Sequence, residues 1–191
     1  MPRARPPLVV VLCAVLAVLV SACGGEDLQP DAVEWRNVAL DVPDDWYVYE
    51  RSDVHLSMSN ADLGTRNEGD ADFVAPDEGV VSMNFTYEPD TVPDDWRRFV
   101  DEQDATLETD QAITLDGDVP ATQLVFSYTS SSGSPTREMV VVIPSRAIVV
   151  LSQPVPARGA SDGPDVFLTH IETFLEVLET AEFGRPVMDE E

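Results

Sequence analysis

The chain has 191 residues, with 36 aspartates and glutamates against 11 arginines and no lysine, so its formal charge at pH 7 is −25. This excess of negative charge argues against DNA or RNA as a partner, because phosphate binding needs clustered cations. It argues equally against docking on an anionic lipid surface through protein side chains. The acids are spread along the chain, which favours a solvated surface suited to high salt over a specific attraction for cations or for a basic partner.

Residues 1–22 have the composition of a bacterial export signal. Two arginines precede an apolar run over 8–20, and this run is shorter than the roughly 20 residues that a membrane-spanning helix needs. The small residues at 21–22 suit a signal-peptidase cut before Cys23. The stretch 19–24 (Leu-Val-Ser-Ala-Cys-Gly) resembles the lipobox of bacterial lipoproteins.

This resemblance implies that the thiol of Cys23 carries a diacylglyceryl group and that acyl chains hold the protein on the outer face of the cell membrane. Two alternatives stay open: an ordinary secretory signal in which Cys23 has no special role, and an uncleaved anchor. In the lipoprotein hypothesis Cys13 leaves with the signal peptide, so the mature monomer cannot form an internal disulfide.

After the anchor, residues 23–32 form a short polar tether, and we expect one folded domain over residues 33–183. Its first strand is predicted at 38–42, where apolar and polar residues alternate. A Pro-Asp-Asp turn follows, and an aromatic strand is predicted at 46–49. A further short strand is expected around 56–58.

An acidic segment over 59–79 has no apolar pattern and exceeds the length of ordinary loops, so it is either functional or mobile. Strict alternation then predicts an amphipathic strand at 80–87. A helix is expected at about 94–103, because acids occupy its first turn and Trp96, Phe99 and Val100 lie on one side.

The second half of the sequence predicts hairpins. One strand ends at Leu115, before an Asp-Gly-Asp turn, and alternation predicts the next strand at 124–128. Two continuous apolar runs, at 139–143 and 147–151, have the pattern of central strands that are covered on both faces.

Helical spacing of apolar residues predicts a closing helix, with Pro164 in its first turn and Gly163 or Asp162 as its cap. We expect Gly184 to stop this helix and residues 184–191 to form an acidic tail.

We expect no metal and no cofactor. The paired aspartates do not continue into a calcium-binding loop with alternating oxygen ligands. His55 and His170 are the only histidines, and the only mature cysteine is predicted to be lipidated, so the usual zinc ligands are missing.

We do not expect an enzyme, because the sequence lacks a nucleophile elbow, a P-loop and a zinc-protease motif. His170 would be the best candidate for a catalytic base, yet its place beside an apolar stripe favours a packed or surface histidine. Trp46 and Trp96 are more typical of core or rim aromatics than of ligand platforms. If a binding groove exists, we expect it between Trp46, Trp96 and the 59–79 segment.

The order of these elements is similar to that of PsbP-like domains, including bacterial envelope proteins of the DcrB and LpqN kinds. The likeness covers residues 33–183 and includes the hairpin pattern around Leu115, Gly117 and Ala121. It implies an α+β fold, an α-β-α sandwich with a mainly antiparallel sheet. It also implies a non-catalytic role, as a binding or accessory subunit for another cell-envelope protein. The alternative is a carrier that holds a small apolar or lipid ligand between sheet and helix.

Overall fold

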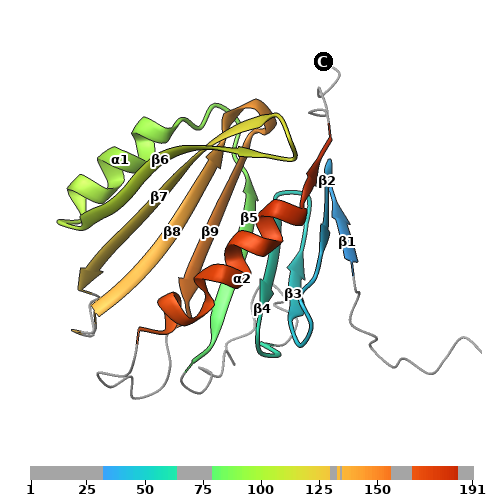
Figure 1. Ribbon diagram of the computed structural model, residues 1–191, viewed down its shortest axis with the longest axis horizontal. Helices are drawn as coiled ribbons and strands as arrows, with labels where there is room; N and C mark the ends of the chain where they lie inside the picture. The colour runs from blue at the N-terminus through green and yellow to red at the C-terminus, as the bar shows by residue number, and fades with distance from the viewer. Residues whose placement is uncertain (1–31, 64–78, 130–132, 134, 156–164, 185–191) are drawn as a thin grey trace, which may run out of the picture.

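The computed structural model describes residues 32–63, 79–129, 133, 135–155 and 165–184 (Figure 1). The predicted signal peptide, Cys23 and nearly all of the tether lie outside these residues, as do the acidic tail after Gly184 and residues 64–78 of the acidic segment. No helix in the described ranges is both long enough and apolar enough to cross a membrane.

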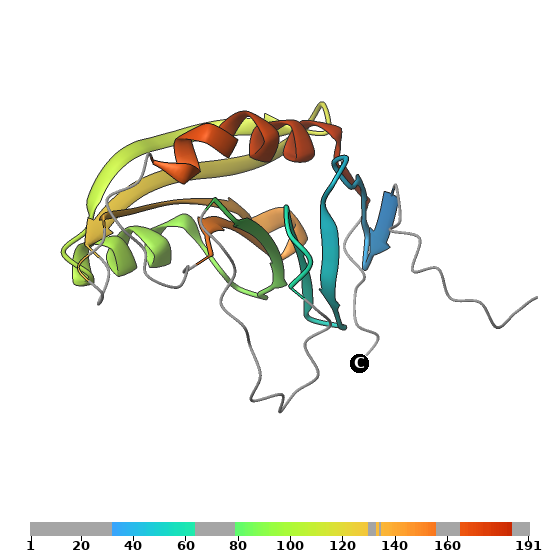
Figure 2. The ribbon, with the colours of Figure 1, turned by 90° about the horizontal axis from the view of Figure 1, so that it is seen from below.

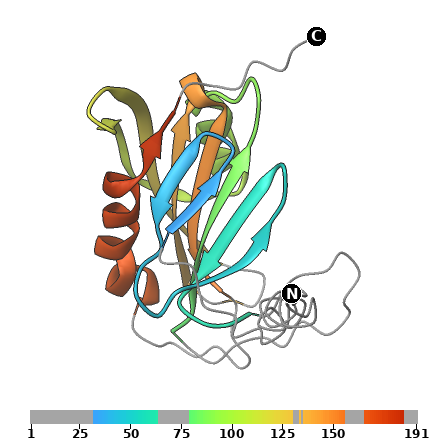
Figure 3. The ribbon, with the colours of Figure 1, turned by 90° about the vertical axis from the view of Figure 1, so that its right-hand side faces the viewer.

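The described chain forms two antiparallel sheets. The larger has seven strands, in the spatial order β3 (Tyr47–Arg51), β4 (His55–Ser59), β5 (Val81–Tyr87), β9 (Ile148–Pro154), β8 (Pro135–Ile143), β7 (Val119–Thr129) and β6 (Thr106–Leu115). The smaller contains β1 (Ala32–Trp35), β2 (Val38–Asp41) and β10 (Glu182–Phe183). Figure 3 shows β10 beside the β1–β2 hairpin, so the first and last described strands share one small sheet.

Two helices cover opposite faces of the larger sheet: α1 (Pro93–Glu102) on one and α2 (Val166–Thr180) on the other (Figure 2). The side chains of β8 alternate between these layers. Met139 and Val141 belong to the α2-side core, whereas Val140 and Val142 pack with α1. This three-layer arrangement confirms the α+β fold and the mainly antiparallel sheet expected from the sequence.

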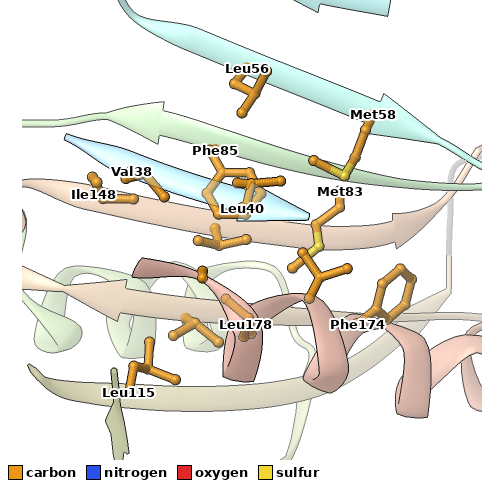
Figure 4. Packing of buried hydrophobic residues seen from close by; sticks show 14 of the residues in the cluster. Val38, Leu40, Leu56, Met58, Met83, Phe85, Leu115, Ile148, Phe174 and Leu178 are labelled. Atoms are coloured by element: carbon orange, nitrogen blue, oxygen red, sulfur yellow. The ribbon is translucent and has the colours of Figure 1, made fainter. Parts of the chain in front are cut away.

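The main core lies between the sheet and α2. Phe167, Phe174 and Leu178 of the helix are almost completely buried against side chains such as Met83 and Phe85 of β5 (Figure 4). Removing such a side chain from water contributes about 1.5–3 kcal/mol, so this layer supplies much of the stability that holds the sheet in shape.

Three predicted features need correction. The closing helix begins at Val166, and its cap is Asp165, whose carboxylate accepts a hydrogen bond from the Leu168 amide at 3.2 Å. The cap is therefore neither Asp162 nor Gly163. The helix also ends at Thr180, four residues before Gly184, because the chain turns into β10 to pair with β2.

Candidate functional site

A cleft of about 510 Å³ opens on the α1 face of the larger sheet, at the side that α1 does not cover. α1 packs over β7 and β8, while the cleft lies over β4, β5 and the second half of β9. We call it the sheet-face cleft; it is lined by Tyr49, Glu50, His55, Ser57, Leu63, Ser82, Asn84, Thr86, Leu151, Gln153 and Val155.

The alternation of β5 explains why the cleft is polar. Met83 and Phe85 point into the core on the α2 side, so Ser82, Asn84 and Thr86 must point to the opposite face. Strand pairing adds polar neighbours from β4, because Ser57 lies opposite Asn84 and His55 lies opposite Thr86. Hydroxyl, amide and imidazole groups therefore gather in two adjacent rows.

A hydrogen-bond network orients the centre of this surface. The Tyr49 hydroxyl donates to Oδ1 of Asn84 at 3.0 Å, which fixes the amide so that its Nδ2 faces Ser82 Oγ at 3.2 Å. The same Nδ2 donates to the carbonyl of Leu151 on β9 at 3.5 Å. Nδ1 of His55 lies 3.4 Å from the Thr86 hydroxyl, so the imidazole is also held. The floor of the cleft is thus preorganised.

Ser57 also lines the cleft, and the residue is only 3% exposed. Glu50 and Gln153 add a carboxylate and an amide to the same lining. The described lining contains no arginine, so the arrangement suits a ligand that donates and accepts hydrogen bonds rather than an anion.

Two hydrogen-bonded side chains with raised pKa values, Tyr128 and Glu138, lie next to the cleft. The Tyr128 hydroxyl donates to Oε1 of Glu138 at 2.5 Å, and Glu138 is only 8% exposed. Burial raises the pKa of Glu138, and the bond from Tyr128 opposes this shift; burial also raises the pKa of Tyr128. Glu138 immediately precedes Met139, which pairs with Ser152, the neighbour of Gln153 in the cleft. The pair is therefore close to the lining on the same sheet.

The structure does not bring the two predicted groove tryptophans together. Trp46 is buried in the α2-side core, where its ring meets Phe174 edge-on with centroids 6.1 Å apart. Trp96 is on α1, on the opposite side of the sheet, with its ring centroid 5.5 Å from that of Phe99. Neither residue lines the sheet-face cleft, although Leu63 from the start of the acidic segment does.

The two histidines differ in their surroundings. His170 is partly exposed on α2, and burial lowers its pKa. His55, considered in the sequence only as a zinc ligand, lines the cleft. Within the described residues, no three His, Cys, Asp or Glu side chains lie together as metal ligands would. The sequence did hold a signal for the cleft: the polar positions of 80–87, which alternate with the core residues.

No protein-family model and no curated protein sequence matches this chain. A Pseudomonas aeruginosa protein of unknown function is similar in structure, with a TM-score of 0.44, 16% identity, and coverage of 82% of this chain and 97% of its own. A Bacteroides thetaiotaomicron structure has a TM-score of 0.43 and 11% identity, with 83% of this chain and 50% of the other covered. The PsbP protein of the cyanobacterium Synechocystis has a TM-score of 0.42 and 14% identity, with coverage of 86% and 98%. Similarity at this level carries no argument about function.

Proposed function

We propose that this chain is a lipid-anchored extracytoplasmic protein that binds a partner through the sheet-face cleft and serves as a non-catalytic accessory subunit for another cell-envelope protein. The observation that carries the proposal is the preorganised polar floor of the sheet-face cleft, where one hydrogen-bond network holds Tyr49, Asn84 and Ser82. A polar segment of a partner protein, with its backbone amides and carbonyls, would form hydrogen bonds with these groups.

The composition of the two faces favours this function over a carrier of an apolar ligand. A carrier would hold its ligand between sheet and helix, where this chain places fully buried side chains such as Phe85, Phe167 and Phe174. The open surface is the polar one, and polar groups there would lose water contacts without compensation on binding an apolar molecule.

The hydrogen bonds of the cleft favour binding over catalysis. A catalytic imidazole is commonly oriented by a carboxylate, whereas the ring of His55 is held by the hydroxyl of Thr86. We therefore propose that these groups recognise a partner and do not activate a nucleophile.

The lipobox resemblance at Cys23 supports the anchoring part of the proposal. From Cys23 to Ala32 the chain reaches at most about 30 Å when fully extended. A tether of this length would keep the cleft close to the membrane, where a membrane-embedded partner is accessible.

The test is site-specific photocrosslinking in the native cell envelope. A photoreactive amino acid at Gln153 reports on the cleft, and one at Leu168, exposed on the opposite helix α2, is the matched control. We expect one envelope protein to be captured from position 153 and not from position 168. Replacement of Ser57 by Leu in the same background should reduce the yield.

The anchor is tested in parallel with Cys23→Ala. We expect this variant to lose incorporation of an alkyne-labelled fatty acid and to be recovered with the soluble fraction. Fatty-acid labelling that is unchanged in Cys23→Ala would refute the lipid anchor. Capture of lipid alone from position 153 would refute the accessory function in favour of the carrier.

A further inference from the structure

A second cleft, of about 280 Å³, lies at the end of the larger sheet where β5 ends and β9 begins. We call it the arginine cleft, because Arg36 of the β1–β2 turn and Arg146 of the short 3-10 turn Pro144–Arg146 both line it. The lining also includes Tyr87, Asp90, Ser145 and Ala147.

Both guanidinium groups are held in place by the fold. The guanidinium carbon of Arg36 lies 3.6 Å from the centroid of the Tyr87 ring, and its Nε donates to the carbonyl of Asp53. Nε of Arg146 donates to the Phe183 carbonyl and Nη1 to the Ser145 carbonyl, each at 3.3 Å. Among the described residues, these bonds use Nε of Arg36 and both Nε and Nη1 of Arg146, and they leave other terminal N–H groups of both side chains available to bind a ligand.

Neither arginine is neutralised by a carboxylate within the described chain. Arg97, Arg98 and Arg137 all form ion pairs with aspartate or glutamate, whereas the bonds of Arg36 and Arg146 all go to backbone carbonyls. In a chain with 36 acids and 11 arginines, two unpaired arginines in one cleft form an unusual positive site.

Backbone strain gathers at the same place. Six described residues other than glycine have a positive φ, and four of these are aspartates, which tolerate the left-handed conformation. The other two are Arg36, with φ 50°, and Ala147, with φ 54°, and both line the arginine cleft. Strain that a fold maintains at one site is a mark of a functional constraint there.

We propose that the arginine cleft binds a carboxylate group, which Arg36 and Arg146 hold through their free N–H groups. The site is separate from the sheet-face cleft and does not depend on the function proposed for it. Asp90 determines the charge of the preferred ligand: two guanidinium groups and one aspartate leave a net charge of +1, which a carboxylate balances. A phosphate dianion would exceed this charge and approach Asp90 unfavourably.

The experiment is a titration of the full chain in detergent micelles, observed through the ¹⁵N–¹H signals of the arginine Nε groups. The probes are sodium acetate and inorganic phosphate, at an ionic strength held constant with chloride. We expect acetate to shift the Arg36 and Arg146 signals saturably, and to bind about tenfold more weakly to Arg36→Gln and to Arg146→Gln. Arg51→Gln is the matched control, because within the described residues Arg51 also donates only to a backbone carbonyl, that of Glu34, and does not line the cleft.

Asp90→Asn gives a test that does not depend on loss of binding. Removal of this negative charge should tighten acetate binding and should strengthen phosphate binding by a larger factor. Non-saturating shifts, or equal acetate affinity in the wild type and in Arg146→Gln, would overturn the site. Tighter binding of phosphate than of acetate by the wild type would overturn the assignment of a carboxylate. If Arg36→Gln fails to fold, Arg146→Gln and Asp90→Asn still decide the question.

Discussion

At Ala147 the backbone turns from the short 3-10 helix into β9 with a left-handed φ of 54°. A β-carbon is unfavourable in this conformation by roughly 1–2 kcal/mol, and glycine avoids that cost at the expense of extra freedom in the unfolded chain. We expect Ala147→Gly to raise the free energy of unfolding by about 0.5 kcal/mol, measured by urea denaturation. Ala112→Gly, on the exposed part of β6, is the control and should lower it, because glycine weakens a strand. If both changes lower the free energy of unfolding equally, the left-handed backbone at Ala147 is not strained.

The raised pKa of Glu138 makes its contribution to the free energy of unfolding fall as pH rises. Its pKa is raised by burial, so the unfolded chain loses this proton at a lower pH than the folded chain. The contribution of Glu138 to stability therefore falls as pH rises above the ordinary carboxyl pKa, until the raised pKa is passed. We expect Glu138→Gln to gain stability relative to the wild type between pH 4 and pH 7, measured by urea denaturation at several pH values.

Tyr128→Phe is the companion variant for this prediction. It removes the hydroxyl that donates to the Glu138 carboxylate, so the pKa of Glu138 should rise further. The loss of stability with rising pH should then be steeper than in the wild type. If Glu138→Gln and the wild type show parallel pH profiles, the buried carboxyl does not titrate as described.

Among the secondary-structure elements, α2 is tied to the sheet by Arg137 of β8. Nε of Arg137 donates to Oε2 of Glu108 on β6 at 2.7 Å, and Nη2 donates to Oε1 at 2.9 Å. Nη1 donates to Asp165, which is also the N-cap of α2. We expect Arg137→Gln to lower the free energy of unfolding by about 1 kcal/mol, measured by urea denaturation at neutral pH. Arg98→Gln should change it much less, because the ion pair of Arg98 with Asp95 is exposed.

The ion pairs of Arg137 with Glu108 and Asp165 should weaken at low pH. The hydrogen bond from Arg137 is the main cause that holds the pKa of Glu108 below its ordinary value. A lowered folded pKa gives stability that is complete above the ordinary carboxyl pKa and is lost as pH falls towards the folded pKa. The difference between wild type and Arg137→Gln should therefore shrink as the pH is lowered below 4. A constant difference down to pH 2 would show that packing, and not charge, is responsible.

The sequence predicted elements well where burial imposed a pattern. The runs at 139–143 and 147–151 are central strands, because β8 and β9 lie between helices on both faces and need apolar side chains on each. Most of β6 was missed for the opposite reason. Its residues from Thr106 to Thr114 are mostly exposed, so their composition shows no period, and pairing with β7 forms the strand. β1 and β10 were missed because each is very short and gains its place by pairing with β2.

For the whole molecule, the negative charge predicts a response to salt. Like charges at this density repel one another and oppose the compact state, and added salt screens that repulsion. We expect the melting temperature to rise from 50 mM to 1 M NaCl. Arg137→Gln should show the larger rise, because it lacks an attractive pair that salt would weaken. A melting temperature that falls with salt would mean that attractive pairs dominate.

The sheet-face cleft could not be located from the sequence, because it is a product of topology. Most of its lining comes from β3, β4, β5 and β9. The strands β5 and β9 are neighbours in the sheet, although α1 and three other strands separate them in the sequence. The polar positions of 80–87 were visible in the sequence, but their neighbours were not. Conversely, Trp46 and Trp96 each follow the tetrapeptide Val-Pro-Asp-Asp, yet they lie on opposite sides of the sheet, so the local sequence does not predict their positions.

The two edges of the larger sheet have a consequence for self-association. An open edge strand can recruit a strand from a neighbouring copy and start a fibre. Here β6 places the charged residues Glu108 and Asp110 on its edge and shifts register between Leu107 and Thr109, while β3 is short and shifts register between Val48 and Glu50. Both devices discourage edge-to-edge growth. Copies of the chain at high concentration would therefore stay separate, and each would keep its clefts available.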